Sequence, residues 1–407
     1  SRFRGIPVLA KLDDSPALRA YADRADIATI GARGPVTPDH SIRTKRTPVV
    51  LTGNAEQDIS DYASAYRAYF DQHNQDGLTC LDPAPRWAIW PGAGLIALGA
   101  DSREAAIIAD IAAHTAKVVQ LAESLGGWEA LSPADIFDVE YWELEQAKLR
   151  KQASAPPLRG KIALVTGAAS GIGRATCEQF LKSGAAVVAL DVDPKITTLF
   201  NSPAALGLIC DLRNPEAIRQ AVNATVRHFG GLDIVVSNAG VFSPGEPIET
   251  LSDATWDQSL QLNLTQHKNL LQVSIPFLRA GIDPAIVVIG SKNVPAPGPG
   301  AVAYSAAKAG LTQLVRVASL ELAADNIRVN ILHPDAVYDT GIWSDGVLET
   351  RAANYGLTVS EYTTRNLLKT AVSSQEVAAL VEALAGPLFA RTTGAQIPID
   401  GGNDRVV

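Results

Sequence analysis

The chain has 407 residues, of which 47% are hydrophobic and 19% charged, and it carries a formal net charge of −8. This profile is typical of a globular protein of two or three domains. The negative balance argues against a nucleic-acid partner, whose phosphates need clustered Lys and Arg. No uninterrupted apolar run of 18 residues is present, so we expect no membrane span.

The three cysteines, Cys80, Cys177 and Cys210, are too few and too scattered for a disulfide framework or a zinc site. Such cysteine usage is typical of a reducing compartment. We therefore expect a cytoplasmic protein.

Residues 1–150 are expected to form a small α/β domain, although 1–46 show no clear period. The patterns predict strands over 47–53 and 86–92 and helices over 59–73 and 103–124. Within the irregular start, "DHSIRTKR" either binds a phosphate or is a solvated basic stretch that ties the segment down. The residues that would bind the phosphate are His40, Arg43, Lys45 and Arg46.

A linker is expected over residues 151–160. The surrounding sequence, 148–161, is basic, rich in small residues and contains Pro156 and Pro157, which resist helix formation. It separates the first 150 residues from a larger domain over 161–407.

In that larger domain, short apolar runs alternate with helical patterns. The runs are 161–167, 186–191, 206–212, 232–240, 285–291 and 327–334. Strands that are apolar on both faces and separated by helices predict a parallel sheet covered on both sides. This is the doubly wound (Rossmann) α/β architecture, in which ligands bind beyond the carboxyl ends of the strands.

The first of these runs ends in a glycine-rich turn, "VTGAASGIGRA" over 165–175. Gly167, Gly171 and Gly173 allow the backbone to approach a pyrophosphate, and the helix that follows offers free N–H groups. A glycine-rich turn alone is a weak signal. Its position between a strand and a helix favours a dinucleotide site over a merely tight turn.

The second run ends at Asp191, 24 residues after Gly167. A carboxylate there accepts hydrogen bonds from ribose hydroxyls and repels a 2′-phosphate. Since no Lys or Arg follows until Lys195, we predict NAD rather than NADP. The alternative is a carboxylate that only caps the turn.

The stretch "GPGAVAYSAAKAGL" places Tyr304 and Lys308 one helical turn apart. Either the small residues let this helix pack closely on another element, or the pair performs acid–base chemistry. A tyrosine has an ordinary pKa near 10, and we expect the Lys308 ammonium and the positive nicotinamide to lower it together.

Taken together, "TGAASGIG", "NAG", Ser291 and "YSAAK" resemble the short-chain dehydrogenases/reductases, over about residues 157–407. The resemblance implies a catalytic tetrad of Asn263, Ser291, Tyr304 and Lys308. Tyr304 would exchange the proton, Ser291 would hold the substrate oxygen and Lys308 would bind the nicotinamide ribose. Asn263 would hold a water, or would be a buried amide that ties elements together.

The same resemblance implies a cofactor site and a homodimer or homotetramer built through helices beside the active site. The implied cofactor-binding residues are Gly167, Ser170, Gly171, Ile172, Gly173, Asp191, Asp211, Leu212, Asn238, Ala239, Gly240, Tyr304, Lys308, Pro334, Val337 and Thr340.

Two places depart from the family pattern. Asp335 follows Pro334 where the family usually has Gly, and Lys292 and Asn293 follow Ser291 where small residues are commoner. Lys292 and Asn293 either bring charge near the substrate or point away. Residues 338–370, which include Trp343, Tyr355, Tyr362 and Arg365, are expected to cover the substrate.

The whole chain resembles the C-terminal part of proteins that join a rhamnulose-phosphate-type class II aldolase to a short-chain dehydrogenase. The segments that carry this resemblance are 37–51, 90–99, 138–150 and 393–407. The zinc cluster of such aldolases needs a His-x-His pair, which is missing from this sequence, so we expect no metal site. The chain also lacks Met at its start, and we expect it to begin after the aldolase core or to descend from a fusion that lost it.

We therefore expect an NAD-dependent oxidoreductase acting on a small alcohol, sugar or hydroxy-aldehyde, such as lactaldehyde or a deoxy sugar. Two alternatives stay open at this point. One is a fragment of a bifunctional aldolase and dehydrogenase, and the other is a non-catalytic NAD-binding sensor.

Overall fold

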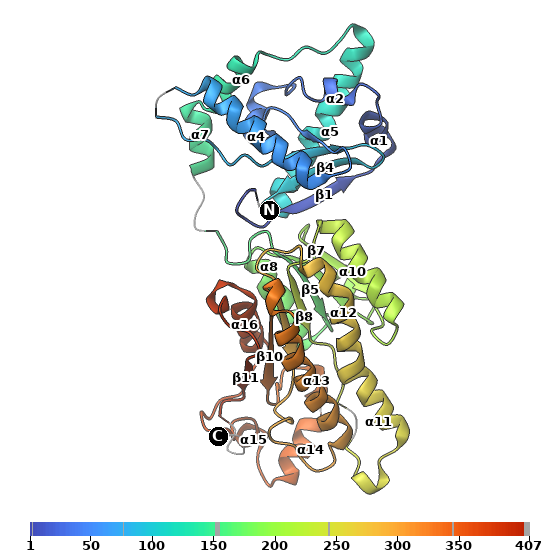
Figure 1. Ribbon diagram of the computed structural model, residues 1–407. Coiled ribbons are helices and arrows are strands. Elements are labelled where there is room, and N and C mark those ends of the chain that lie inside the picture. The colour runs from blue at the N-terminus through green and yellow to red at the C-terminus, as the bar shows by residue number, and fades with distance from the viewer. Residues whose placement is uncertain (2, 76, 151–154, 243–244, 344–345, 403–407) are drawn as a thin grey trace. The chain divides into compact units, whose positions relative to one another are not determined.

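The computed structural model describes residues 1, 3–75, 77–150, 155–242, 245–343 and 346–402. The chain forms two compact units, one of residues 1–160 with 227–230 and the other of residues 161–226 with 231–407. Each unit has a β-sheet of its own (Figure 1). Residues 151–154 of the expected linker and 403–407 of the C-terminal motif lie outside the described residues.

The N-terminal unit is a four-stranded sheet with helices, and its strand order is β1-β4-β3-β2. β4 pairs antiparallel with β1 and β3, whereas β2 pairs parallel with β3. In chain order its elements are β1 (Leu9–Asp13), α1 (Pro16–Ala22), α2 (Ile27–Ile30), α3 (Ser41–Thr44), β2 (Val49–Val50), α4 (Ala55–His73), β3 (Trp87–Trp90), β4 (Gly94–Gly99), α5 (Ser102–Leu125), α6 (Pro133–Glu140) and α7 (Glu143–Arg150).

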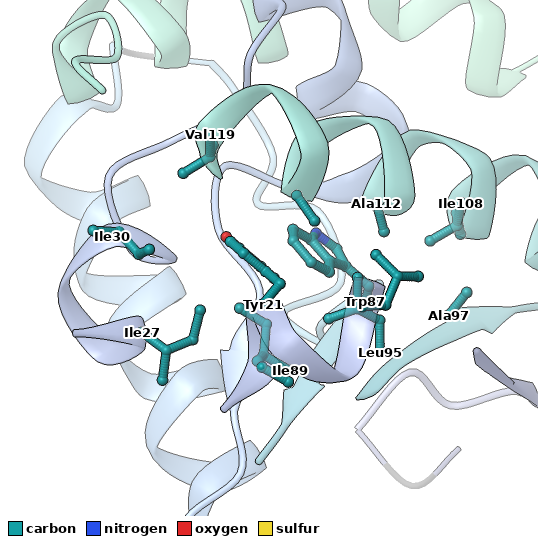
Figure 2. Packing of buried hydrophobic residues seen from close by; sticks show 13 residues of the cluster. Tyr21, Ile27, Ile30, Trp87, Ile89, Leu95, Ala97, Ile108, Ala112 and Val119 are labelled. Carbon is teal, nitrogen blue, oxygen red and sulfur yellow. The ribbon is translucent and has the colours of Figure 1, made fainter. Parts of the chain in front are cut away.

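The core of this unit lies between the sheet and helix α5. Trp87 and Ile89 of β3 meet Ile108 and Ala112 of α5 in one buried cluster (Figure 2). The apolar side chains of α5 recur every three or four residues because a helix on a sheet buries one face. The predicted helices over 59–73 and 103–124 are thus confirmed as α4 and α5.

Two strands of this unit were missed by the sequence patterns. β1 lies in the segment without a clear period, and its partner β4 follows β3 through a short turn. Gly94 closes that turn with φ 133°, and a Cβ there would lie 2.2 Å from the Asp13 carbonyl oxygen. Only glycine allows this approach.

Among the described residues, α5 is the one helix whose length and composition would allow it to cross a membrane. The expectation of no membrane span stays a prediction, because a helix packed in a globular core passes the same test of length and composition. The buried face of α5 is accounted for by its packing in the core cluster.

The C-terminal unit is a seven-stranded sheet in which every strand pair is parallel. The strand order is β11-β10-β9-β8-β5-β6-β7, so it reverses between β5 and β8. Four strands, β5, β8, β9 and β10, are buried along their whole length. The predicted doubly wound architecture is confirmed, and its ligand site is expected at the reversal.

Helices and strands alternate along the C-terminal unit. In chain order its elements are β5 (Ile162–Thr166), α8 (Gly171–Lys182), β6 (Ala186–Asp191), α9 (Ile196–Leu199), β7 (Ala205–Ile209), α10 (Pro215–Phe229), β8 (Ile234–Ser237), α11 (Asp253–Leu260), a π-helical turn (Gln261–Thr265), α12 (Gln266–Leu278), β9 (Ala285–Ile289), α13 (Val302–Glu321), β10 (Arg328–Pro334), α14 (Val347–Asn354), α15 (Val359–Thr363), α16 (Ser374–Ala385) and β11 (Gln396–Ile399).

Candidate active site

The glycine-rich turn joins β5 to α8 at the point where the strand order reverses. Gly167 and Gly171 have φ of 66° and 51°, in the left-handed region that favours glycine. A Cβ on Gly173 would lie 2.1 Å from the Gly167 carbonyl oxygen. The turn therefore needs these three glycines for its own geometry.

The N-terminus of α8 has no side-chain cap, since Ser170 occupies the N-cap position without such a hydrogen bond. In contrast, Asp101, Ser252 and Ser373 cap α5, α11 and α16 with their side chains. Uncapped amides and the helix dipole favour an anion at this end. The turn and the helix end together fit the pyrophosphate of a dinucleotide.

Asp191, at the end of β6, lies against this turn. Its Oδ2 accepts a hydrogen bond from the Ala169 amide at 2.9 Å, and its Oδ1 accepts one from the Asp193 amide at 3.0 Å. Each carboxylate oxygen has two lone pairs, so Asp191 can position the turn and still accept bonds from ribose hydroxyls.

Asp211 follows β7, and unlike Asp191 its carboxylate pairs with an arginine. Its carboxylate forms an ion pair with Arg213 at 2.7 Å, and this hydrogen bond lowers the pKa of Asp211. The neighbouring Leu212 is buried. β7 ends at Ile209, so both residues lie just beyond the strand rather than within it.

The ends of β5 and β8 are held together by Thr166 and Asn238. The Thr166 hydroxyl accepts from the amides of Asn238 at 2.9 Å and Ala239 at 3.1 Å. The Asn238 amide group donates to the Thr166 carbonyl at 2.8 Å. Sequence reasoning missed Thr166, whose only signal is a hydroxyl residue directly before the glycine turn.

Lys308, on α13, is almost fully buried, and its ammonium donates to the Ile289 carbonyl at 2.9 Å. Burial lowers its pKa to about 8. No ion pair joins it to a carboxylate of the described residues. A Cβ on Gly240 would lie 3.5 Å from this ammonium, so the glycine keeps the space beside it open.

Tyr304 and Ser291 come together as the sequence predicted. Burial raises the pKa of Tyr304, and the nearby Ser291 side chain opposes this by favouring the phenolate. The Lys308 ammonium lies 5.9 Å from the centre of the Tyr304 ring. Burial therefore sets the direction of this pKa shift in the structure, and the expected lowering by Lys308 together with the nicotinamide stays a prediction.

Asn263 lies in the π-helical turn between α11 and α12, a feature that is frequent at functional sites. Its side chain donates to the Val241 carbonyl at 3.0 Å and accepts from the Val241 amide at 3.1 Å. The amide thus ties this turn to the segment after β8. A direct role in holding water stays a prediction.

Beyond β10, Thr340 reaches the glycine turn. A Cβ on Gly171 would lie 2.9 Å from the Thr340 methyl carbon, and the Thr340 hydroxyl donates to the Val337 carbonyl at 2.8 Å. Pro334 ends β10 and accepts from the Lys292 amide at 3.0 Å. Thr340 therefore lies against the glycine turn, whereas the contact of Pro334 is to the residue that follows Ser291.

The two places where the sequence departs from the family pattern, after Ser291 and after Pro334, lie side by side in the structure. Lys292 and Asp335 form an ion pair whose side chains are 11% and 13% exposed. Lys292 lies three residues beyond the end of β9, and Asp335 directly follows β10. These two strands are neighbours in the sheet, which explains why the two residues can pair. His333 of β10, which sequence reasoning missed, is buried, and its Nδ1 lies 3.0 Å from the Ser291 carbonyl oxygen.

Aromatic and arginine side chains gather in the segment expected to cover the substrate. Tyr338 packs on Trp343 with ring centres 4.9 Å apart, and Tyr362 contacts both rings. Arg365 stacks on Tyr355 and Tyr362. Residues 344–345 of this segment lie outside the described part of the chain.

In the N-terminal unit, the residues suggested to bind phosphate do not converge. Lys45 is buried 3.6 Å from Glu140, whereas Arg43 is exposed. The charge of Lys45 is thus already neutralised, which disfavours the phosphate interpretation. Among the described residues, no group of three or more His, Cys, Asp or Glu side chains is placed to hold a metal ion.

Comparison with known proteins divides the chain in two. Residues 2–149 match the second domain of class II aldolases, and residues 161–347 match the short chain dehydrogenases. YuxG of Bacillus subtilis, described as an uncharacterized oxidoreductase, is 28% identical over 424 residues, which cover 97% of this chain and 61% of YuxG. This chain therefore spans less than two thirds of that relative.

Further similarities concern the C-terminal unit. The short-chain type dehydrogenase/reductase y4mP of Sinorhizobium fredii, itself uncharacterized, is 33% identical, covering 60% of this chain and 98% of y4mP. The structure of 3-ketoacyl-(acyl-carrier-protein) reductase from Brucella melitensis, complexed with NADH, has a TM-score of 0.55 and 25% identity. It covers 61% of this chain and 100% of that one.

Proposed function

This chain belongs to the short-chain dehydrogenase/reductase family, and we propose that it uses NAD to oxidise or reduce a small alcohol, sugar or hydroxy-aldehyde. Membership makes it an oxidoreductase of CH–OH groups with a nicotinamide cofactor. The observation that carries the proposal is the placement of the Ser291 side chain beside the Tyr304 hydroxyl, with the buried Lys308 ammonium 5.9 Å from the centre of the Tyr304 ring and paired with no carboxylate of the described residues.

In the proposed reaction, the nicotinamide supplies the hydride acceptor or donor. Ser291 holds the substrate oxygen by a hydrogen bond, and Tyr304 exchanges the hydroxyl proton. Because burial raises its pKa, Tyr304 keeps its proton at neutral pH. This is the form that donates to a carbonyl during reduction, whereas oxidation needs the phenolate and is expected to accelerate as pH rises.

The proposed preference for NAD rests on Asp191. Its carboxylate lies against the glycine turn, where it would accept from the ribose hydroxyls and repel a 2′-phosphate. Replacing Asp191 with Ala is expected to lower the ratio of kcat/KM for NAD over that for NADP by about tenfold or more. An unchanged ratio would contradict this role.

The proposed homo-oligomer rests on an apolar groove between the π-helical turn and α13. The groove is lined by Leu264, Thr265, Lys268, Gly310, Gln313, Leu314 and Val317. Gly310 lets the elements approach closely, since a Cβ there would lie 3.1 Å from Leu264. A Val317→Glu variant that stays oligomeric in light scattering would contradict this assignment.

The first test is a spectrophotometric screen at 340 nm with NAD or NADP and a panel of diols, aldoses and deoxy sugars. Lactaldehyde with NADH is run in the reverse direction. Tyr304→Phe is expected to lose turnover by about 10²- to 10⁴-fold. Full turnover in that variant would overturn the mechanism, and turnover with NADP alone would overturn the cofactor assignment.

A second candidate, aldol cleavage, is favoured by the aldolase-domain match over residues 2–149. It predicts cleavage of a ketose phosphate that depends on added Zn²⁺ and survives in Tyr304→Phe. Absence of zinc-dependent cleavage by the full chain would remove this candidate.

A further inference from the structure

Arg351, on α14, lies close to the candidate catalytic tyrosine. Its guanidinium carbon is 5.7 Å from the centre of the Phe242 ring and 5.7 Å from that of the Trp343 ring. Phe242 in turn packs on Tyr304, with ring centres 4.9 Å apart. One ring therefore separates the guanidinium from the phenol.

No ion pair joins Arg351 to a carboxylate among the residues that the structure describes. Other arginines of this unit do form such pairs, for example Arg213 with Asp211 and Arg279 with Asp325, each at 2.8 Å or less. Arg365, which stacks 4.6 Å from the Tyr362 ring centre, also has no such pair. The segment thus presents two guanidinium groups whose charge the described residues do not neutralise.

The acidic residues of the same helices are occupied elsewhere. Glu349 accepts from the Gly346 amide at 2.8 Å, and Glu361 accepts from the Thr358 amide at 2.8 Å, so both serve as helix caps. Asp335 is paired with Lys292. The carboxylates that the structure describes in this segment therefore leave the positive charge of Arg351 available.

We infer that the substrate of this site carries a carboxylate or phosphate, and that Arg351 binds that group. The inference rests on the proposed function, whose substrate class it narrows to hydroxy acids and phosphorylated sugars. The planar guanidinium donates paired hydrogen bonds to either anion, and stacking on Phe242 and Trp343 holds its plane before the substrate arrives. Arg351 is a specificity-determining residue, while Tyr304 performs the proton transfer.

The test compares substrates that differ only in charge: lactate with lactamide, 3-hydroxybutyrate with 3-hydroxybutyramide, and ribose 5-phosphate with ribose. Binding to the full chain is measured by calorimetry with NADH present, and turnover is measured at 340 nm. At least one anionic member is expected to bind ten times or more tighter than its neutral twin. Arg351→Met should remove that preference, since a charged hydrogen bond contributes roughly 10- to 100-fold.

Arg219→Met on the exposed face of α10 is the matched control and should keep the preference. Arg351→Lys should keep part of it, which separates charge recognition from a folding defect. The inference would be overturned if the wild type bound the charged and neutral members of each pair equally, or if no anionic member bound measurably. It would also be overturned if Arg351→Met weakened the binding of both members of a pair equally. Charge-dependent binding without any turnover would support the inference and contradict the proposed function.

Discussion

The two units each bury a lysine beside a tyrosine, and the partners of the two lysines differ. Lys45 lies 3.9 Å from the centre of the Tyr66 ring and 3.6 Å from Glu140, whose carboxylate also accepts from the Tyr66 hydroxyl. Lys308 donates to a backbone carbonyl and has no ion pair with a carboxylate of the described residues. Burial lowers the pKa of both lysines to about 8.

This difference separates a structural cation from a functional one. A buried charge is expensive unless it is paired, and Glu140 offsets much of that cost for Lys45. Lys308 instead adjoins Gly240, where the missing side chain leaves room beside the ammonium. A buried lysine without a carboxylate partner destabilises the folded protein. We interpret its presence next to Tyr304 as a functional requirement, because the ammonium stays available to a ligand.

The largest expected effect follows from removing Lys308. The Lys308→Met variant should lower kcat/KM by about 10²- to 10⁴-fold, the range for a group that supports proton transfer. The free energy of unfolding at pH 7 should not decrease, because the substitution removes a buried charge that no described carboxylate offsets. Steady-state kinetics measures kcat/KM, and denaturant unfolding measures the free energy of unfolding. A variant that is destabilised but fully active would show that Lys308 has a structural role instead of a functional one.

Removing Lys45, the lysine paired with Glu140, should lower stability and leave activity unchanged. Lys45→Met removes the ammonium that pairs with Glu140, and breaking a buried pair costs about 3–5 kcal/mol of stability. Turnover at the Tyr304 site, measured below the unfolding transition, should be unchanged. The double variant Lys45→Met/Glu140→Gln should recover most of the loss, and failure to recover would show that packing, not charge, is responsible.

The pH dependence of stability sharpens the comparison. Unfolded lysine has a pKa of about 10.4, whereas folded Lys308 has one of about 8. Below pH 8 both states are protonated and the burial cost is fully present. Between about pH 8 and 10 the folded state loses its proton first, so the free energy of unfolding rises by up to about 1.4 kcal/mol per pH unit.

Unfolding curves of the wild type and Lys308→Met at several pH values measure this contribution. The wild type should gain stability relative to the variant as pH rises through that window. Parallel curves would mean that folded Lys308 titrates near its ordinary pKa.

The smallest expected effect concerns the paired lysine of the C-terminal unit. Lys292→Met or Asp335→Asn removes a partly exposed pair that links the ends of β9 and β10. We expect about a fivefold rise in KM for the cofactor, equivalent to about 1 kcal/mol, with kcat within about twofold. The exchange Lys292→Asp/Asp335→Lys should restore KM, and a large loss of kcat in either single variant would place the pair in the chemistry instead.

Much of the fold and of the candidate site follows from local patterns. Apolar runs between helical patterns predict the parallel sheet, and three glycines after the first run predict a turn that no other residue type can form. The four-residue spacing of Tyr304 and Lys308 places them on one helix face. Such features depend on residues that are close in the chain, so the sequence alone determines them.

Only the tertiary structure decides which distant residues meet. Lys292 pairs with Asp335, Lys45 with Glu140, and Arg351 lies over Phe242, although long segments separate the members of each pair. The raised pKa of Tyr304 likewise reflects burial by many elements rather than its neighbours in sequence. Contacts and desolvation depend on packing across the fold, and no local period encodes them.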